Sequence, residues 1–232
     1  MLGEKLKDFY KTIEENRNKY YGRDMGKEPV ELRNAMIGYL LEHIPEGSIW
    51  FDLFTGDGVV PLALLHLQEQ GLAPRVKELW VTTYQAQDTP HLTQYPLVQV
   101  DAGLAEPDVN KPDGRLVKIN AEALGIKTPI VYVDVDLNGP FWHDEITPRN
   151  LVGVATLIDS AKYVKCPMLF FDELNKRLSN FKSRVHVLQA GKIPPSFLED
   201  FKNEVLFLDR SENFVEGEQD GVSYVSQFLG EK

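Results

Sequence analysis

The chain has 232 residues, of which 43% are hydrophobic, and it carries a formal net charge of −10 at pH 7. This length allows one substantial hydrophobic core, as in a globular protein. The acidic balance argues against binding along bulk duplex nucleic acid, which needs clustered Lys and Arg side chains, and it favours a small molecule or a protein as partner.

A single cysteine, Cys166, precludes an internal disulfide, and we expect it to be a small core residue in a reducing compartment. No segment reaches the roughly 18 uninterrupted apolar residues of a membrane span, and the N-terminus is charged rather than signal-like. We therefore expect a cytoplasmic protein that does not cross a membrane.

The N-terminal part of the chain is predicted to start with helices and then to alternate strand and helix. Apolar residues at helical spacing, and proline or glycine at the expected ends, mark these elements. The predicted elements are an amphipathic helix over residues 2–20, a helix after Pro29, a strand over 48–53, a helix over 59–70 and a strand over 78–84.

The remainder of the chain starts with a polar, proline-punctuated segment over residues 85–114, which we expect to be a ligand-facing loop region. Two strong buried strands are expected after it, over 129–135 and 167–171. The other predicted elements are a short strand over 116–119, a helical turn over 120–125, helices over 148–163, 173–181 and 195–201, and strands over 185–189, 204–208 and 221–228, of which the last two form an antiparallel hairpin.

Consecutive apolar strands separated by helices predict an α/β fold, with a mainly parallel sheet and helices on both faces. We divide the chain into an N-terminal helical extension, residues 1–28, and one α/β domain, residues 29–232. In such sheets ligands bind beyond the carboxyl ends of the strands, so the candidate site residues are sought at the strand exits.

The first strand exit lies in the segment SIWFDLFTGDGVVPLALLHL, residues 48–67. Gly56 and Gly58 lack a Cβ atom, so the backbone can approach a ligand closely, and the following helix directs unpaired N–H groups to the same place. Asp52 could accept hydrogen bonds from a ligand amine or hydroxyl. The alternative is a merely close strand-to-helix connection.

A second exit, residues 134–145, places four carboxylates, an amide and an imidazole within twelve residues. Asp134 and Asp136 lie two positions apart in an extended segment, so they could share a divalent cation, or one could have a raised pKa. Asn138 could bond an amine or a base edge, and His143 is the only histidine placed for catalysis. Alternatively, the aromatic residues of this segment pack beneath it and its acidic residues cap the next helix.

Several enzyme classes are disfavoured by missing motifs. The five histidines have no metal-binding spacing, and with one cysteine a zinc site is not expected. Neither the Gly-x-Ser-x-Gly elbow nor the phosphate-binding Gly-x-x-x-x-Gly-Lys-Ser/Thr loop is present, which argues against triad hydrolases and the common nucleotide hydrolases.

The segment DLFTGDG, residues 52–58, resembles motif I of the class I methyltransferases that use S-adenosylmethionine, commonly D-x-F-x-G-x-G. The segment NGPF, residues 138–141, resembles their motif IV, N/D-P-P-F/Y, with glycine at one proline position. The resemblance extends over residues 30–228. It implies a Rossmann-like fold, S-adenosylmethionine as cofactor, and methyl transfer to a nitrogen or oxygen acceptor.

The resemblance also implies roles for individual residues. Gly56 and Gly58 would let the methionine part of the cofactor lie against the loop, with Asp52 near its amino group. Asp101 or Ala102 would neighbour the adenine, and Thr55 and Thr82 are assigned to the same cofactor site. In the family the second strand usually ends in an acidic residue that binds the ribose, whereas here it ends in VTTYQ, residues 81–85.

Catalysis in such an enzyme would consist chiefly of aligning the two reactants. The resemblance implies that Asn138 or Asp136 orients the acceptor, and that Asp134 or His143 accepts its proton.

Two other functions remain open from the sequence. The first motif also resembles the strand-turn-helix of Rossmann-like sensor domains that bind cyclic oligoadenylates, where Thr82 could contact phosphates, so a non-enzymatic nucleotide-binding or interaction module is one alternative. A metal-dependent nucleotide-sugar transferase using Asp134 and Asp136 is the other.

Overall fold

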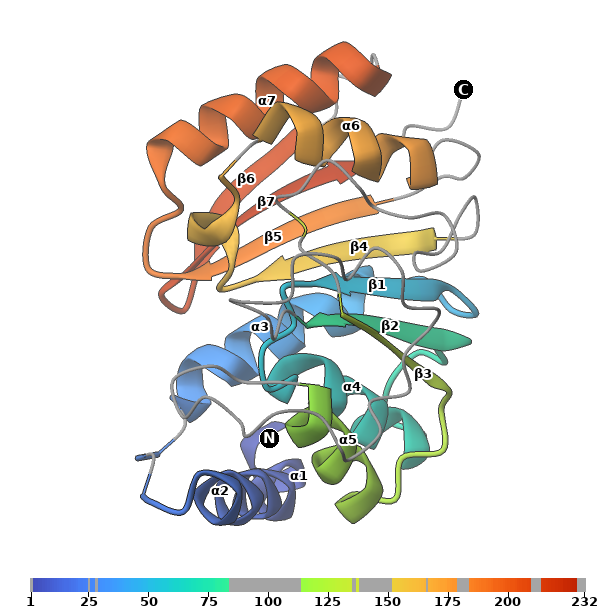
Figure 1. Ribbon diagram of the computed structural model, residues 1–232, viewed down its shortest axis with the longest axis vertical. Helices are drawn as coiled ribbons and strands as arrows, with labels where there is room; N and C mark the ends of the chain where they lie inside the picture. The colour runs from blue at the N-terminus through green and yellow to red at the C-terminus, as the bar shows by residue number, and fades with distance from the viewer. Residues whose placement is uncertain are drawn as a thin grey trace.

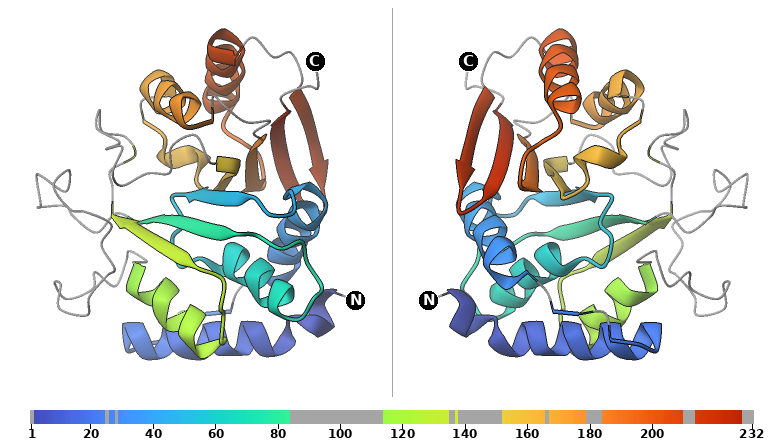
Figure 2. Two further views of the ribbon diagram at one scale, coloured as in Figure 1. Left: turned by 90° about the vertical axis from the view of Figure 1, so that its right-hand side faces the viewer. Right: turned by 90° about the vertical axis from the view of Figure 1, so that its left-hand side faces the viewer.

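The computed structural model describes residues 2–24, 26–27, 29–83, 114–134, 137, 152–165, 167–178, 184–209 and 214–228. These residues form one sheet with helices on both of its faces (Figures 1 and 2). The strands are β1 (Ile49–Leu53), β2 (Glu78–Thr83), β3 (Ile130–Asp134), β4 (Val152–Ile158), β5 (Arg184–Ala190), β6 (Phe214–Gln219) and β7 (Val222–Phe228). The helices are α1 (Leu2–Lys5), α2 (Lys7–Tyr21), α3 (Val30–His43), α4 (Val59–Glu69), α5 (Gly114–Ala123), α6 (Pro167–Leu178) and α7 (Pro195–Asp209).

The strand order is β3-β2-β1-β4-β5-β7-β6, with β1 to β5 parallel and β7 antiparallel to both of its neighbours. The chain moves outward from β1 to β3 and then returns to β4 on the other side of β1. The strand order therefore reverses between β1 and β4, which is where open α/β sheets bind ligands. The predicted α/β class, with a mainly parallel sheet and a closing antiparallel hairpin, is confirmed.

Neighbouring residues of β1 point to opposite faces of the sheet and enter different cores. Trp50 belongs to the cluster formed with α1 to α5, whereas Phe51 belongs to the cluster formed with α6 and α7. All five residues of β1 are buried. This near-continuous apolar character is typical of a parallel strand covered on both faces.

The N-terminal helix α2 lies on the side of the first of these faces, beyond α4 and α5 (Figure 2). Leu6, Phe9 and Ile13 are fully buried in the cluster that also contains Trp50. Helix α2 contacts α4 and α5. The division of the chain at residue 28 stays a prediction.

The helix predicted over residues 148–163 is wrong, because residues 152–158 are strand β4, followed by a 3-10 turn, Ala161–Tyr163. Residues 154–157 are consecutively buried, since β4 lies in the middle of the sheet between β1 and β5. A short apolar run that is buried on both faces has no alternation, and periodicity alone cannot separate it from a buried helix.

Two predicted strands are helical instead. Residues 167–171 belong to α6, in which Phe170, Phe171 and Leu174 are buried while the two residues between them are only partly so. Residues 116–119 belong to α5, whose buried positions 116, 117, 120 and 121 follow the helical period.

The strand predicted over 204–208 is also wrong, because α7 continues to residue 209 with Phe197, Phe201 and Val205 buried at every fourth position. The first strand of the hairpin is β6, which follows α7. Its residues are exposed or only partly buried, so its sequence lacks the alternation of a half-buried strand. Asp220 and Gly221, both at positive φ, form the two-residue turn to β7.

Candidate ligand site

The loop after β1 is held in place by the end of β2. The Phe54 N–H donates to Thr82 Oγ1 at 2.8 Å, and the Thr55 N–H donates to the Thr82 carbonyl oxygen at 3.0 Å. The Thr55 hydroxyl donates to the Asp52 carbonyl oxygen at 2.8 Å and accepts from the Thr82 N–H at 3.1 Å. Phe54 itself has a positive φ of 55°, a costly conformation for a residue with a bulky side chain. These bonds fix the loop that leads into α4.

Asp52 is buried at the end of β1, with 1% of its surface exposed. It lies in register with Thr156 of β4, and the Thr156 hydroxyl donates to its Oδ1 atom. The Trp50 Nε1–H donates to the Thr156 oxygen at 2.8 Å, which directs the Thr156 proton towards the carboxylate. Burial raises the pKa of Asp52 from 3.8 to about 7, against the opposing effect of hydrogen bonds from Thr156 and Thr55.

The two glycines of the loop have different structural reasons to be glycine. Both have a positive φ, 61° for Gly56 and 72° for Gly58. A Cβ atom on Gly58 would lie 3.2 Å from Cγ2 of Val117, so this position is closed by packing against α5. A Cβ atom on Gly56 would meet no described atom within 4 Å. Gly56 is thus the position where the backbone is open to a ligand.

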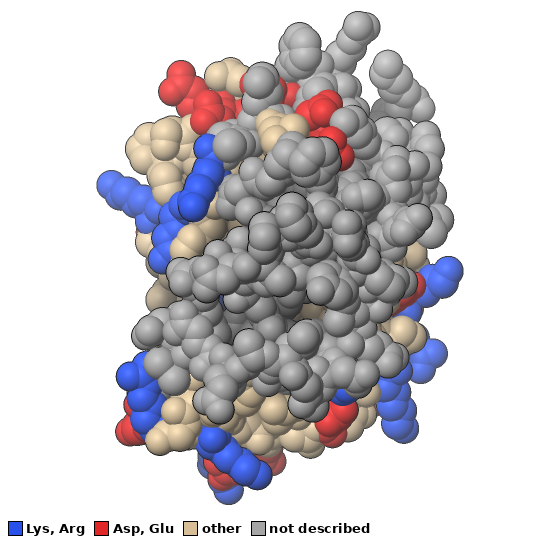
Figure 3. Space-filling view, viewed as in Figure 1, with Lys and Arg blue, Asp and Glu red and all other residues tan. Residues whose placement is uncertain are grey.

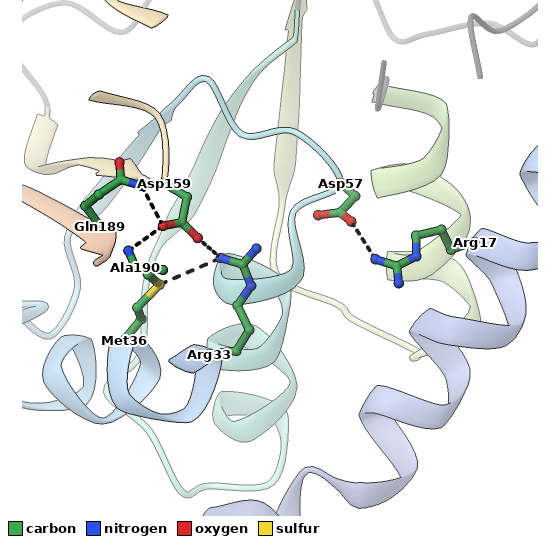
Figure 4. Close-up of polar contacts among 7 residues, drawn as sticks. All are labelled: Arg17, Arg33, Met36, Asp57, Asp159, Gln189 and Ala190. Carbon is green, nitrogen blue, oxygen red and sulfur yellow. Dashed lines mark hydrogen bonds and ion pairs between the residues drawn. The ribbon is translucent and has the colours of Figure 1, made fainter. Parts of the chain in front are cut away.

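Asp57, between the glycines, connects the loop to the N-terminal helices. Its Oδ2 atom lies 3.6 Å from Nη1 of Arg17 on α2, and both side chains are largely buried, 21% and 12% exposed (Figure 4). Nη2 of Arg17 also donates to the Gly26 carbonyl oxygen at 2.9 Å. Helix α2 therefore supplies an ion pair to the glycine loop.

The exit of β4 carries a second aspartate, Asp159, which has a positive φ of 54°. Its Oδ1 atom accepts the Ala190 N–H at 2.6 Å and Nε2 of Gln189 at 3.2 Å, both at the end of β5. Its Oδ2 atom accepts a charged hydrogen bond from Nη1 of Arg33 on α3 (Figure 4). Asp159 is therefore anchored by three donors, in a conformation that asparagine and aspartate adopt more readily than other residues.

A cavity of about 220 Å³ lies between these two strand exits. Its described lining comes from the first turn of α3, the end of β1 with the loop and the start of α4, and the end of β4 with the turn that follows it. Its described lining includes three carboxylates and one guanidinium, those of Asp52, Asp57, Asp159 and Arg33. Asp57 is paired with Arg17 and Asp159 with Arg33, so Asp52 is the lining carboxylate without a cationic partner among the described residues. A positively charged group of a ligand would be favoured beside Asp52.

One wall of the cavity is aromatic. The ring centroid of Phe54 lies 6.5 Å from that of Tyr163 and 6.0 Å from that of Phe170. Tyr163 lines the cavity while 51% of its surface is exposed, so it stands at the rim. Nζ of Lys162 lies 5.0 Å from the Tyr163 ring centroid. A planar group that enters the cavity would meet the rings of Phe54 and Tyr163.

The structure brings together part of the predicted cofactor site. Asp52, Thr55 and Gly56 line the cavity. Gly58 precedes the first turn of α4 and packs against Val117. Thr82 is buried and holds the loop through the bonds given above. Asp101 lies outside the described residues.

The predicted catalytic residues lie mostly outside the described part of the chain. This holds for Asp136, Asn138 and His143, and only the backbone of Asp134 is described, as the last residue of β3. β3 is separated from β1 by β2, whereas β4 is adjacent to β1. The assignment of these residues to catalysis stays a prediction.

Sequence reasoning missed Arg17, Arg33 and Asp159, which contribute charge to the site. The signal for Asp159 was present, because an acidic residue directly follows the apolar run of β4. Because that run predicts a helix, the sequence does not mark its end as a strand exit. The two arginines lie on helices that precede β1, and no local pattern marks them.

Among the described residues, no group of three or more His, Cys, Asp or Glu side chains is arranged to hold a metal ion. No helix in the described part of the chain has the length and apolar character needed to cross a membrane. On the described portion of the face in Figure 3, basic side chains lie close to acidic ones. The expectation that bulk duplex nucleic acid does not bind stays a prediction.

These features define an α/β domain with a ligand cavity where the strand order reverses. Among solved structures, the chain is similar to a methyltransferase from Pyrococcus furiosus, with a TM-score of 0.54 and 12% identity over 96% of each chain. It is also similar to a SAM dependent methyltransferase from Aquifex aeolicus, with a TM-score of 0.50 and 16% identity over 88% of this chain and 94% of that one. Neither a scan of protein-family models nor a search of curated proteins gives a match. The chain has the Rossmann-like fold of class I S-adenosylmethionine-dependent methyltransferases, as the motif resemblance predicted.

Proposed function

We propose that this chain is a methyltransferase that binds S-adenosylmethionine in the cavity between β1 and β4 and transfers its methyl group to a nitrogen or oxygen acceptor. The cofactor supplies an electrophilic methyl group on a positively charged sulfur. The observation that carries the proposal is the position of the cavity at the reversal of strand order, with the buried carboxyl of Asp52 in its described lining.

The charge of the cavity fits this cofactor. S-adenosylmethionine carries an ammonium, a sulfonium and a carboxylate, and so has one net positive charge. Asp52 is the carboxylate best placed for the ammonium, because it lies at the cavity wall and, unlike Asp57 and Asp159, has no arginine partner among the described residues. Burial raises its pKa to about 7. A cation next to Asp52 would stabilise its ionised form. A cyclic oligonucleotide offers phosphates and no ammonium for Asp52, so the cavity supports the sensor alternative less well.

The shape of the loop also fits. The open side of Gly56 lets a ligand approach the backbone closely. The volume of about 220 Å³ is below the roughly 300–1,000 Å³ of pockets that bury a whole drug-sized ligand. We therefore assign the cavity to the methionine end of the cofactor, and from the sequence we assign Asp101 to the adenine end.

In this proposal the residues of the chain act mainly by holding the two reactants in line. Asp52 and the Gly56 backbone hold the methionine end, and Thr55 and Thr82 maintain the loop that presents them. Asn138 or Asp136 is proposed to orient the acceptor. Asp134 or His143 is proposed to take the proton that the acceptor loses.

The test is a calorimetric titration of the purified protein with S-adenosylmethionine. We expect micromolar binding by the wild type and loss of binding in Gly56→Val, because the new side chain would enter the cavity. Gly71→Val is the matched control, since Gly71 has a similar φ of 71° and its Cβ position also has no described atom within 4 Å, but it lies at the other end of α4.

No heat at millimolar S-adenosylmethionine would refute the proposal, and so would equal binding by the wild type and Gly56→Val. A wild type that binds cyclic oligoadenylate instead would favour the sensor function. A manganese-induced rise in melting temperature that Asp136→Asn abolishes would favour the metal-dependent transferase.

A further inference from the structure

Arg33 is the cavity-lining arginine of the described chain, and it comes from the first turn of α3. Its Nη1 atom donates to Oδ2 of Asp159 and lies 3.8 Å from the sulfur of Met36. The side chain is 19% exposed. The guanidinium, which lines the cavity, is therefore held in place by Asp159 (Figure 4).

The partner that holds Arg33 is itself fixed without it. Asp159 accepts hydrogen bonds on Oδ1 from the Ala190 N–H and the Gln189 side chain, and its own N–H donates to the Leu188 carbonyl oxygen at 2.8 Å. Asp159 is thus a fixed acceptor that holds Nη1 of the guanidinium in place. A guanidinium has five N–H groups in one plane and can hold two carboxylates at once.

A carboxylate that enters this cavity faces Asp52, Asp57 and Asp159, so it requires a cation at the wall. In S-adenosylmethionine the ammonium and the carboxylate are attached to the same carbon atom. If Asp52 holds the ammonium, the carboxylate must lie within a few ångströms of it. Arg33, which lines the same cavity, supplies the complementary charge.

We propose that Arg33 binds the α-carboxylate of the cofactor, so that Arg33 and Asp52 together recognise the α-amino-acid end of the ligand. This inference rests on the proposed function. It makes Arg33 a specificity-determining residue, because ligands that lack the carboxylate would lose a charged, fork-shaped contact.

The test compares two ligands, S-adenosylmethionine and its decarboxylated analogue, by calorimetry on the full chain. We expect the wild type to prefer S-adenosylmethionine by about tenfold to a hundredfold, the range for a hydrogen bond to a charged group. In Arg33→Met the preference should fall to about onefold. Arg33→Lys keeps the charge without the planar fork and should retain part of the preference.

Arg184→Met is the matched control. Arg184 is also partly buried and donates from Nη1 to the His43 carbonyl oxygen at 3.2 Å. It starts β5, so it lies at the opposite end of the sheet from the cavity, and its substitution should leave the ligand preference unchanged. Melting curves of each variant check that it is folded.

A wild type that binds both ligands equally, or an Arg33→Met variant that keeps the preference, would overturn the role of Arg33 and leave cofactor binding intact. The comparison of ligands on the wild type needs no variant, so it decides the matter even if Arg33→Met does not fold. Absence of any binding by the wild type at millimolar S-adenosylmethionine would overturn the proposed function, and this inference with it.

Discussion

The buried carboxyl of Asp52 should make the stability of this protein depend on pH in a specific way. Its pKa is raised to about 7 in the folded chain, against 3.8 for the free side chain. Between these values the folded protein holds a proton that the unfolded chain has lost. Stability from this group is therefore fully present below about pH 3.8 and is lost as the pH rises through about 7.

The magnitude follows from the shift. Between pH 5 and about pH 7 the folded chain keeps a proton that the unfolded chain has lost. Over these two pH units the free energy of unfolding falls by 1.36 kcal/mol per unit, about 3 kcal/mol in total. Above about pH 7 both states are ionised, and the contribution stays constant up to pH 8. Asp52→Asn cannot ionise, and its amide oxygen can still accept the hydrogen bond from the Thr156 hydroxyl. We expect the variant to gain about 3 kcal/mol of stability relative to the wild type between these two pH values.

Urea denaturation of both proteins at pH 5 and pH 8 measures this difference, because the contributions of all other groups cancel. Thr156→Ser is the matched control, since it keeps the hydroxyl donor and should follow the wild-type profile. Parallel stability profiles for wild type and Asp52→Asn would show that the Asp52 carboxyl is not desolvated as the structure implies.

Three further outcomes are expected. Gly58→Ala should lower the free energy of unfolding by more than the about 1–2 kcal/mol that a left-handed backbone costs a residue with a Cβ atom, because the new Cβ would also lie 3.2 Å from Val117. Urea denaturation measures this loss, with Gly71→Ala as the control that has the left-handed backbone without the contact. A double-mutant cycle of Arg17→Ala and Asp57→Asn should give a coupling of about 1 kcal/mol for this partly buried pair, and zero coupling would disprove it. Burial lowers the pKa of His186 from 6.5 to about 3, so stability is present above about pH 6.5 and is lost towards pH 3, by about 3 kcal/mol at pH 4.5; His186→Gln should lack this loss in acid denaturation.

The part of the fold around the glycine loop could be predicted from the sequence because its signals are local. The buried run of β1, the glycines at positive φ and the helical spacing of α4 all lie within residues 48–70. The same local signals predicted Asp52 and Gly56, and the motif resemblance added Thr55; all three line the cavity. A strand followed directly by a glycine turn and a helix has few alternative structures.

The errors lie where burial on both faces removes the periodic signal. The apolar residues of β4 and of the start of α6 are equally compatible with a strand or a helix. The sequence predicts a helix for β4 and a strand for the start of α6, and both predictions are wrong. The sequence predicts the closing antiparallel hairpin correctly but assigns its first strand to the wrong residues. The true first strand, β6, lies at the edge of the sheet and contains Glu216, Gly217 and Glu218, which are typical of a turn. Its position depends on pairing with β7, which is a tertiary contact.

The prediction of a helix in place of β4 also affects which acidic residues the sequence assigns to the site. Without β4, the carboxylates after β3 form the second predicted strand exit. Strands lie about 4.8 Å apart, so the backbone of Asp134, two strands from Asp52, is about 10 Å away across the sheet, whereas the exit of β4 is one strand away. Asp159 therefore lies nearer to Asp52 than Asp134 does, and it lines the cavity. Its carboxylate is already bound by Arg33 and by two donors at the end of β5. It is suited to positioning Arg33 rather than to accepting a proton, so any proton acceptor must come from another segment, and the residues after β3 remain the proposed source.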